Sequence, residues 1–490
     1  MQGINAEPLT HRRKKKSVFL HNSRKSITFE VVNNQVNTYA LMCKGNKNKS
    51  NEQEKSFFSD VFNVEKPVKI GFTAPELSNL GGMALVSQTD KESGLLDKFA
   101  SLIPEWRNEQ LLVHSIPQLV KQRVLQIAAG YEDTDDCDDL RNDSILKMCV
   151  GRTPNDVSLA SQPTMSRLEN RMTHRELYGM AKMFVEHFIS SYKKEPKRII
   201  LDFDDSNSNT YGAQQLTLFN EYYHEYCYMP LFVFEGYSGK LVLPILRPGR
   251  VNKQVNVAGL MIRLVEELRK KWKDTFIVIR GDCMFCCPRF MKWAATQDKV
   301  RFITGLSGNS ALNKLTSKWI DEVREEYAKT RQDVRRYHEL RYKAGSWKQE
   351  ERVIVKIEHN EKGLNVRYVV TNLKDKNPRK LYEKKYCKRG DCELYIKEMK
   401  NGVFADRMSC SKFSANQFRL YLSGLAYILL QDVRHKMFRK SSLSTATLTT
   451  LRNKIIFSPV KVTEQKTQIK VEFQPGHPKR GWLEWNLRTA

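Results

Sequence analysis

The stretch "KRIILDFDD" (residues 197–205) joins an apolar run to three carboxylates near its end. A short apolar run with polar residues on both sides is typical of a strand buried in a sheet. Side chains alternate along a strand, so Asp202 and Asp204 share one face while Asp205 points to the other. The sequence therefore predicts a buried strand with Asp204 at its C-terminal end and Asp202 as a second carboxylate on that face.

The segments after this strand predict an α/β domain. The expected elements are a strand, a strand, a helix, a strand, a helix and a strand: "LFVFEG" (231–236), "KLVLPILRP" (240–248), 256–272, "DTFIVIRGD" (274–282), 288–297 and "VRFITGL" (300–306). In this order Asp204 and Asp282 each stand at the C-terminal end of a strand. Ligands of α/β sheets bind at that end of the strands, so we expect the functional site there. Strand-end aspartates are also common as helix caps and turn formers, and this alternative stays open.

The composition points to a polyanionic partner. The chain has 490 residues and a formal net charge of +27, and such an excess is typical of proteins that bind nucleic acid. A lysine-rich surface without a polyanionic partner is the alternative. The ten cysteines are scattered, which favours a reducing, intracellular compartment. The longest apolar run (418–430) is broken by Arg419 and too short to cross a bilayer, so we expect no membrane partner.

Composition and periodicity divide the rest of the chain. The predicted regions are a basic, disordered tail (1–66), a helical DNA-binding region (67–195), the first part of the α/β domain (196–309), a β-rich insertion (310–380), the second part of the α/β domain (381–440) and a basic C-terminal segment (441–490). In the insertion we expect a charged helix over 317–343 and a β-hairpin over 352–373. An apolar helix is expected over 414–438.

A third acidic candidate lies in "YCKRGDCELYIKEMK" (386–400), which places Glu393 among basic side chains. At 100° per residue, Tyr386, Arg389, Glu393 and Lys400 fall within roughly a 60° sector of one helix. Glu393 can be an ordinary ion-pair partner of Arg389 or Lys397. Alternatively it joins Asp204 and Asp282, in which case a hard divalent cation such as Mg²⁺ offsets the repulsion among the three. Two such ions can promote in-line displacement at phosphorus.

These residues resemble a known family. The order strand–Asp204, strand–Asp282, insertion and helix–Glu393 is similar to the RNase-H-like fold of DDE transposases. The spacing Y-x2-R-x3-E-x6-K, formed by Tyr386, Arg389, Glu393 and Lys400, resembles the hairpin-forming insertion-sequence group (group 1 transposase DDE domain). Further matching stretches are "SQPTMSRLENR" (161–171), "FNEYYHEYCYMPLFVFEG" (219–236), "LRPG" (246–249), "VIRGDCMF" (278–285), "YVVTNL" (368–373) and "DRMSCSKFSANQFRL" (406–420).

The resemblance implies a cut-and-paste transposase. Asp204, Asp282 and Glu393 would bind two Mg²⁺ (or Mn²⁺) ions, with Asp202 as a further candidate. Water would attack at the end of the element, the freed 3′-hydroxyl would form a hairpin on the opposite strand, and the reopened end would join target DNA. The implied partners are double-stranded DNA, as terminal inverted repeats and as target, and a second copy of the chain in a synaptic homodimer. The implied location is the cytoplasm, at the bacterial nucleoid.

Several residues are candidates for DNA contact. The resemblance implies that Tyr386, Arg389 and Lys400 contact phosphates near the cleaved bond, and Lys397 is a further basic candidate on the same helix. Related enzymes flip a base onto an aromatic side chain of the insertion, for which Trp347 is the candidate; packing beneath the hairpin is the alternative. For recognition of the element's end the candidates are Arg167 and Arg171, which can equally form surface ion pairs.

Two other functions remain open. One is a catalytically inactive or repurposed transposase-derived protein that binds DNA without cutting it. The other is a non-transposing RNase-H-like nuclease, which would cut without any dependence on the sequence of the ends. Substitution of Glu393 separates an enzyme from a binding protein, because only the enzyme loses an activity.

Overall fold

The computed structural model describes residues 74–250 and 257–488, and all structural statements below refer to them. The predicted basic tail, 1–66, lies outside this part of the chain. All described residues except Ala74 belong to one compact unit, Pro75–Ala490. None of the helices within the described ranges has the length and apolar character needed to cross a membrane.

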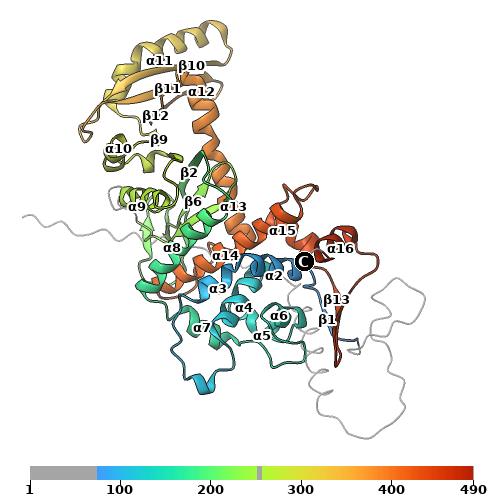
Figure 1. Ribbon diagram of the computed structural model, residues 1–490. Coiled ribbons are helices and arrows are strands. Elements are labelled where there is room, and N and C mark those ends of the chain that lie inside the picture. Colours follow the sequence, from blue (N-terminus) through green and yellow to red (C-terminus); the bar gives the residue numbers. More distant parts are fainter. Residues whose placement is uncertain (1–73, 251–256, 489–490) are drawn as a thin grey trace, which may run out of the picture. The chain divides into compact units, whose positions relative to one another are not determined.

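The unit is built around a mixed sheet of eight strands (Figure 1). The strands β2, β8 and β9 are parallel, whereas β6 and β7 follow β2 in antiparallel order. In spatial order, the strands are β10 (Val334–Tyr342), β11 (Glu351–Asn360), β12 (Gly363–Thr371), β9 (Val300–Leu306), β8 (Phe276–Gly281), β2 (Arg198–Asp205), β6 (Leu231–Glu235) and β7 (Leu241–Ile245).

The apolar runs explain the centre of this sheet. Strands that are buried on both faces have nearly continuous apolar sequences, and β2 is buried along most of its length between β6 and β8. Helices α9 (Val257–Arg269) and α10 (Pro288–Ala295) connect β7 to β8 and β8 to β9. The predicted strands and helices of the α/β domain are therefore confirmed. Because β2 and β8 are parallel, their C-terminal ends lie at the same edge of the sheet.

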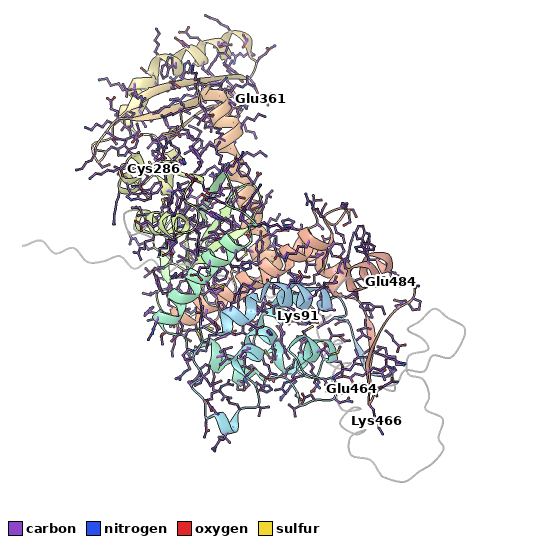
Figure 2. The ribbon with its side chains drawn as sticks, in the orientation of Figure 1. Lys91, Cys286, Glu361, Glu464, Lys466 and Glu484 are labelled. Atoms are coloured by element: carbon purple, nitrogen blue, oxygen red, sulfur yellow. The ribbon has the colours of Figure 1, made fainter. Side chains whose placement is uncertain are left out.

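The insertion extends the sheet instead of standing apart from it. The predicted hairpin is confirmed as β11 and β12, with Glu361 in the turn (Figure 2), and β12 pairs antiparallel with β9. The predicted helix over 317–343 is wrong beyond Thr330, where α11 (Ser310–Thr330) ends. Arg331 adopts a left-handed conformation, with φ of 55°, and the following residues pair along β11 as strand β10.

A small three-stranded sheet was not predicted. It consists of β3 (Ser208–Asn209), β4 (Leu218–Asn220) and β5 (Glu225–Tyr228), in the order β3-β5-β4. These strands lie in the chain between the end of β2 and the start of β6. The small sheet therefore starts at the edge where Asp204 lies.

Helix α14 (Phe413–Met437) joins the helical region to the large sheet (Figure 1). It contacts β7 and several helices of the N-terminal region, and its side chains are buried almost all round, as expected of a core helix. Its Gln417 side chain accepts a hydrogen bond from the Leu246 amide at 2.7 Å, and Gln431 donates to the Gly239 carbonyl at 2.8 Å. The predicted apolar helix at 414–438 is thus confirmed.

The helical region shares a continuous apolar core with the sheet. Its helices are α2 (Met83–Ser93), α3 (Leu95–Ala100), α4 (Ile116–Ala129), α5 (Asp136–Leu140), α6 (Ser144–Cys149), α7 (Gln162–Glu169) and α8 (His174–Ser190). Buried Arg123 of α4 pairs with Glu169 of α7, with Nε and Oε1 2.9 Å apart. This ion pair ties two of the helices together inside the region.

The C-terminal part starts with the helical segment that carries Glu393. This segment consists of α12 (Pro378–Lys380), a π-helical turn (Leu381–Tyr386), a 3₁₀ turn (Cys387–Arg389) and α13 (Gly390–Val403). After α14 follow α15 (Leu448–Leu451), a second π-helical turn (Arg452–Ile456), β13 (Val460–Glu464), β14 (Ile469–Phe473) and α16 (Arg480–Arg488). Strand β13 pairs with β14 and with the short β1 (Leu77–Ser78), so both ends of the unit meet in one sheet.

Replacing Leu425 of α14 by Ala should lower the free energy of unfolding by about 2–5 kcal/mol, because a fully buried leucine leaves a cavity when truncated. Urea unfolding followed by circular dichroism measures the change. The control is Leu315→Ala in α11, whose side chain is largely exposed and should change stability by no more than about 0.5 kcal/mol. Equal effects of the two substitutions would contradict the central packing of α14.

Candidate active site

Asp204 and Asp282 lie at the same edge of the large sheet. Asp204 is the penultimate residue of β2, and Asp282 directly follows Gly281, the last residue of β8. The Asp282 side chain caps a short 3₁₀ turn by accepting a hydrogen bond from the Met284 amide at 2.8 Å. The structure thus brings both predicted strand-end aspartates to the predicted edge.

Arg389 links Asp204 to Glu393. Its Nη1 lies 3.5 Å from Oδ2 of Asp204, and its Nη2 lies 3.1 Å from Oε1 of Glu393. The Asp204 side chain is buried, that of Arg389 is half-buried, and that of Glu393 is 60% exposed. Glu393 therefore forms the helical ion pair with Arg389 that the sequence left open, and the pair lies beside Asp204.

Burial and mutual repulsion raise the pKa values of the two aspartates. Burial is the largest cause for Asp204, and the negative charges of Asp282 and Asp205 add to it, so that its pKa rises to about 7 although Arg389 lowers it. The pKa of Asp282 is raised first by burial, against its hydrogen bond from Met284. Burial acts to lower the pKa of Arg389, but the surrounding acids outweigh it and the pKa is raised. The carboxylates of this cluster therefore outnumber the single guanidinium of Arg389.

The donor chemistry of this cluster fits a divalent cation. Carboxylate oxygens are the ligands that Mg²⁺ and Mn²⁺ prefer, and a cation would relieve the repulsion that raises the pKa of Asp204. Within residues 74–250 and 257–488, however, no three acidic, histidine or cysteine side chains are placed so that they could hold one ion. The carboxylate of Glu393 forms an ion pair with Arg389 instead.

Asp202 is held by a different partner. Asp202 and Arg280 are register partners on β2 and β8, both side chains are buried, and Nη2 donates to Oδ2 at 2.6 Å. Nε of Arg280 donates to the other oxygen, so both oxygens of Asp202 are bound by the guanidinium. Burial raises the pKa of Asp202 to about 6, against the lowering effect of Arg280. Asp202 therefore forms a structural ion pair in which both of its oxygens accept hydrogen bonds from Arg280.

Two arginines that the sequence analysis missed support the site. Arg280 donates from Nη1 to the Lys385 carbonyl at 2.7 Å, so it also fixes the segment before Tyr386. Arg247, in the "LRPG" stretch, lies 2.5 Å from Oδ2 of Asp205 and forms an ion pair with it. The matching stretches "LRPG" and "VIRGDCMF" contain both arginines, but only the pairing of the strands reveals their partners.

Tyr386 and Lys400 contact different parts of the structure. A methyl group on Gly305 would lie 2.8 Å from the Tyr386 hydroxyl and 2.8 Å from the Cys283 amide nitrogen, so the hydroxyl lies next to the peptide that follows Asp282. Lys400 donates from Nζ to the Asn207 carbonyl at 2.7 Å and lines a cavity of about 580 Å³. Lys397 is exposed on the same helix. Arg389 thus lies next to Glu393 and Tyr386, whereas Lys400 contacts Asn207. Because π and 3₁₀ turns precede α13, the regular helical spacing does not extend from Tyr386 to Lys400.

Comparison with known proteins identifies the family. The family model for group 1 of the transposase DDE domain matches residues 61–488. The chain belongs to this family. A cryo-EM structure of a piggyBac transposase synaptic complex with hairpin DNA is similar, with 11% identity, coverage of 78% of this chain and 83% of that chain, and a TM-score of 0.42. No curated protein matches the sequence.

Trp347 of this transposase-family chain is not placed to stack on a base. It is 7% exposed and packs edge-to-face against Tyr342, with ring centroids 5.4 Å apart. Trp347 is therefore packed inside the protein, as the alternative interpretation expected, and its ring is not accessible to a DNA base in this structure.

Arg167 and Arg171 lie on an aromatic and basic surface of the helical region. The Arg171 guanidinium lies 4.9 Å from the centre of the Trp106 ring. Arg167 lines a cavity of about 770 Å³ together with Arg107 and Arg141. Arg167 and Arg171 therefore border cavities of the helical region that Trp106 also lines.

Replacing Asp204 by Asn should raise the free energy of unfolding near neutral pH, because it removes a buried charge. The pKa of Asp204 in the folded protein, about 7, lies above the ordinary value of 3.8. The charged carboxylate therefore destabilises the wild type fully above about pH 7, and this destabilisation disappears as the pH falls toward the ordinary pKa. At roughly 1.4 kcal/mol per pKa unit, the gain at about pH 8 is on the order of 2–4 kcal/mol.

Urea unfolding of the wild type and of Asp204→Asn at several pH values measures this difference. The gap between the two proteins should narrow steadily from about pH 8 to about pH 4.5. Asp321→Asn, an exposed aspartate of α11, is the control and should match the wild type throughout. A variant that is less stable than the wild type at the higher pH would show that the Asp204 charge is stabilised.

Proposed function

We propose that this protein is a DNA transposase that cuts the ends of a mobile element and joins them to target DNA by metal-dependent phosphoryl transfer. The observation that carries the proposal is the placement of Asp204 and Asp282 at one sheet edge, with Glu393 joined to Asp204 through Arg389. Membership of the transposase DDE family supports it. The strand order β7-β6-β2-β8-β9, with β2, β8 and β9 parallel, supports an RNase-H-like catalytic domain.

The metal ligands in this proposal are Asp204, Asp282 and Glu393. Two bound Mg²⁺ (or Mn²⁺) ions would supply an activated water or 3′-hydroxyl and stabilise the charge that develops at phosphorus. Glu393 is exposed and its carboxylate is held by Arg389. A DNA phosphate that binds Arg389 would compete with this carboxylate and leave Glu393 free to turn toward the two aspartates.

The basic residues of the segment would bind the DNA backbone. Arg389 presents a planar guanidinium that suits a bidentate contact with phosphate, and the Tyr386 hydroxyl beside the Asp282–Cys283 peptide can donate to a second phosphate oxygen. Lys400 is held by Asn207 at the rim of a cavity, where its ammonium group can meet the neighbouring phosphate. Lys397, exposed on α13, would add a longer-range attraction.

The partners proposed are the terminal inverted repeats of an element and a target duplex. Assignment to the hairpin-forming insertion-sequence group is part of this proposal and is supported by the spacing of Tyr386, Arg389, Glu393 and Lys400. Arg167 and Arg171 would contact the repeat from the helical region. A second copy of the chain would hold the other end in a synaptic homodimer.

A DNA-binding protein that no longer cuts is the second candidate. It is favoured by the pairing of Glu393 with Arg389 and by the lack of a three-ligand cluster in the described ranges. The two candidates differ in whether the protein cuts DNA and whether that cutting depends on Glu393.

Replacing Glu393 by Gln should reduce metal-dependent nicking of a supercoiled plasmid that carries the element's ends by at least about 100-fold. Substitution of a residue that only hydrogen-bonds to a metal ligand already lowers metal affinity or activity by about 10- to 100-fold, and Glu393 is proposed as a ligand itself. Binding to end DNA, measured by fluorescence anisotropy without metal, should change little. Asp391→Asn is the matched control on the same helix, because Asp391 pairs with Lys388 and not with Arg389. Unchanged nicking by Glu393→Gln would remove Glu393 from the ligand set.

Replacing Lys400 by Ala should weaken DNA binding similarly for all sequences, because a phosphate contact carries no sequence information. The slope of log affinity against log salt concentration should become shallower by about 0.9, the amount expected for one phosphate. Anisotropy titrations over a series of salt concentrations measure the slope. Lys91→Ala in α2 is the control with an unchanged slope, and an equal slope for Lys400→Ala would place Lys400 outside the DNA interface.

A further inference from the structure

An exposed group of aromatic side chains lies on the small sheet. Tyr222 is 84% exposed, Tyr226 61% and Phe219 43%. Phe219 and Tyr226 are register partners on β4 and β5, and their rings meet edge-to-face with centroids 5.5 Å apart. We call residues 208–228, which contain β3, β4 and β5, the aromatic hairpin. Exposed apolar clusters of this kind mark contact sites in soluble proteins.

The aromatic hairpin is held firmly by its base. Asn220 accepts a hydrogen bond from the Tyr222 amide at 3.0 Å, and its side-chain amide donates to the Gly249 carbonyl at 2.8 Å. A methyl group on Gly249 would lie only 2.1 Å from the Cys227 carbonyl, so the backbone of the "LRPG" stretch packs directly on β5. The hydrogen bonds of Asn220 and the packing of Gly249 against Cys227 therefore hold the strands that carry the exposed rings.

The hairpin adjoins the carboxylate cluster. It begins three residues after Asp205, which pairs with Leu231 at the start of β6, so both ends of the hairpin leave the sheet at the edge that carries Asp204. The charges of Asp205 and Asp204 contribute to the raised pKa of the Tyr223 hydroxyl, after burial as the main cause. Tyr223 in turn lies against Tyr222, with ring centroids 4.9 Å apart.

Both acidic and basic side chains lie around the aromatic hairpin. Glu225 is exposed beside the aromatic side chains, and exposed Glu221 forms an ion pair with Arg250, with Nη2 and Oε1 3.3 Å apart. The proposed phosphate contacts are Arg389, in the 3₁₀ turn before α13, and Lys400, on α13. Lys400 donates to the carbonyl of Asn207, directly before β3, so a DNA strand whose phosphate binds Lys400 would pass beside the aromatic hairpin.

We propose that Phe219, Tyr222 and Tyr226 form a stacking platform for unpaired bases of the DNA strand beside the cleaved bond. The proposal rests on the proposed function, which supplies DNA as the substrate. Bases in a duplex are covered by their neighbours, so the aromatic rings can take up only bases that have left the stack. Stacking on an aromatic ring does not require a particular base, because every base has a π-face. Trp347 is buried, whereas the rings of the aromatic hairpin are accessible.

The test compares two DNA probes with the full-length protein in the absence of divalent metal. One probe is a duplex with a short mismatch bubble that contains 2-aminopurine, and the other is the same duplex fully paired. The wild type should bind the bubble more tightly than the paired duplex and should quench the 2-aminopurine fluorescence. The triple substitution of Phe219, Tyr222 and Tyr226 by Ala should weaken bubble binding by about 5- to 150-fold per stacked base and abolish the quenching. Its affinity for the paired duplex should stay within about twofold, because no backbone contact is removed.

Two controls separate stacking from other effects. Tyr222→Phe combined with Tyr226→Phe keeps the rings and should bind the bubble as the wild type does. Tyr237→Ala removes a tyrosine that is 66% exposed in the β6–β7 turn, at the opposite end of β6, and should have no effect. Unfolding in urea confirms that each variant is folded.

Three results would overturn the proposal. The first is a wild type that does not prefer the bubble, and the second is a triple variant that loses affinity for both probes equally. The third is a triple variant that binds the bubble normally but loses self-association in light scattering, which would assign the hairpin to a protein contact. Because no cleavage is measured, failure of the stacking platform leaves the Glu393→Gln result intact, and loss of cutting leaves the bubble preference intact.

Discussion

The buried ion pair between Asp202 and Arg280 fixes the centre of the structure. It joins β2 to β8 at one register, and this register places Asp204 and Asp282 at the same edge of the sheet. Arg280 also holds the Lys385 carbonyl, so the same side chain positions the segment that leads to Arg389. A buried ion pair adds little net stability over an apolar pair, but removal of one partner is costly. The pair therefore acts mainly by excluding other registers and other positions of that segment.

The cluster around Arg389 is a balance of charges. Asp204, Asp282 and Glu393 outnumber the single guanidinium of Arg389, and burial of the two aspartates keeps water from compensating their charge. Any cation that enters relieves repulsion, whereas any phosphate that enters competes for Arg389. In the proposed function, this arrangement would favour binding of metal and DNA together over binding of either alone.

The sequence predicted those features that depend on local pattern. The apolar runs located β2, β6, β8 and β9, and the parallel order placed Asp204 and Asp282 together. The features it missed depend on distant partners: "RRYHELRY" (335–342) has the charged composition of a helix but becomes a strand by pairing with β11. The partners of Asp202 and the burial of Trp347 likewise appear only once strands or rings are packed. The aromatic hairpin escaped prediction because its strands are short and polar residues interrupt its rings.

The strand β10 has a consequence for how copies of this protein behave at high concentration. It forms an outer border of the large sheet among the described strands, and an outer strand can template pairing with another molecule. Here the strand carries bulky ionic side chains that are satisfied within the chain, Arg335 with Glu358 and Arg336 with Glu326. A neighbouring strand would have to displace these partners and bring like charges together. The border of the sheet is thereby shielded against fibril-like stacking.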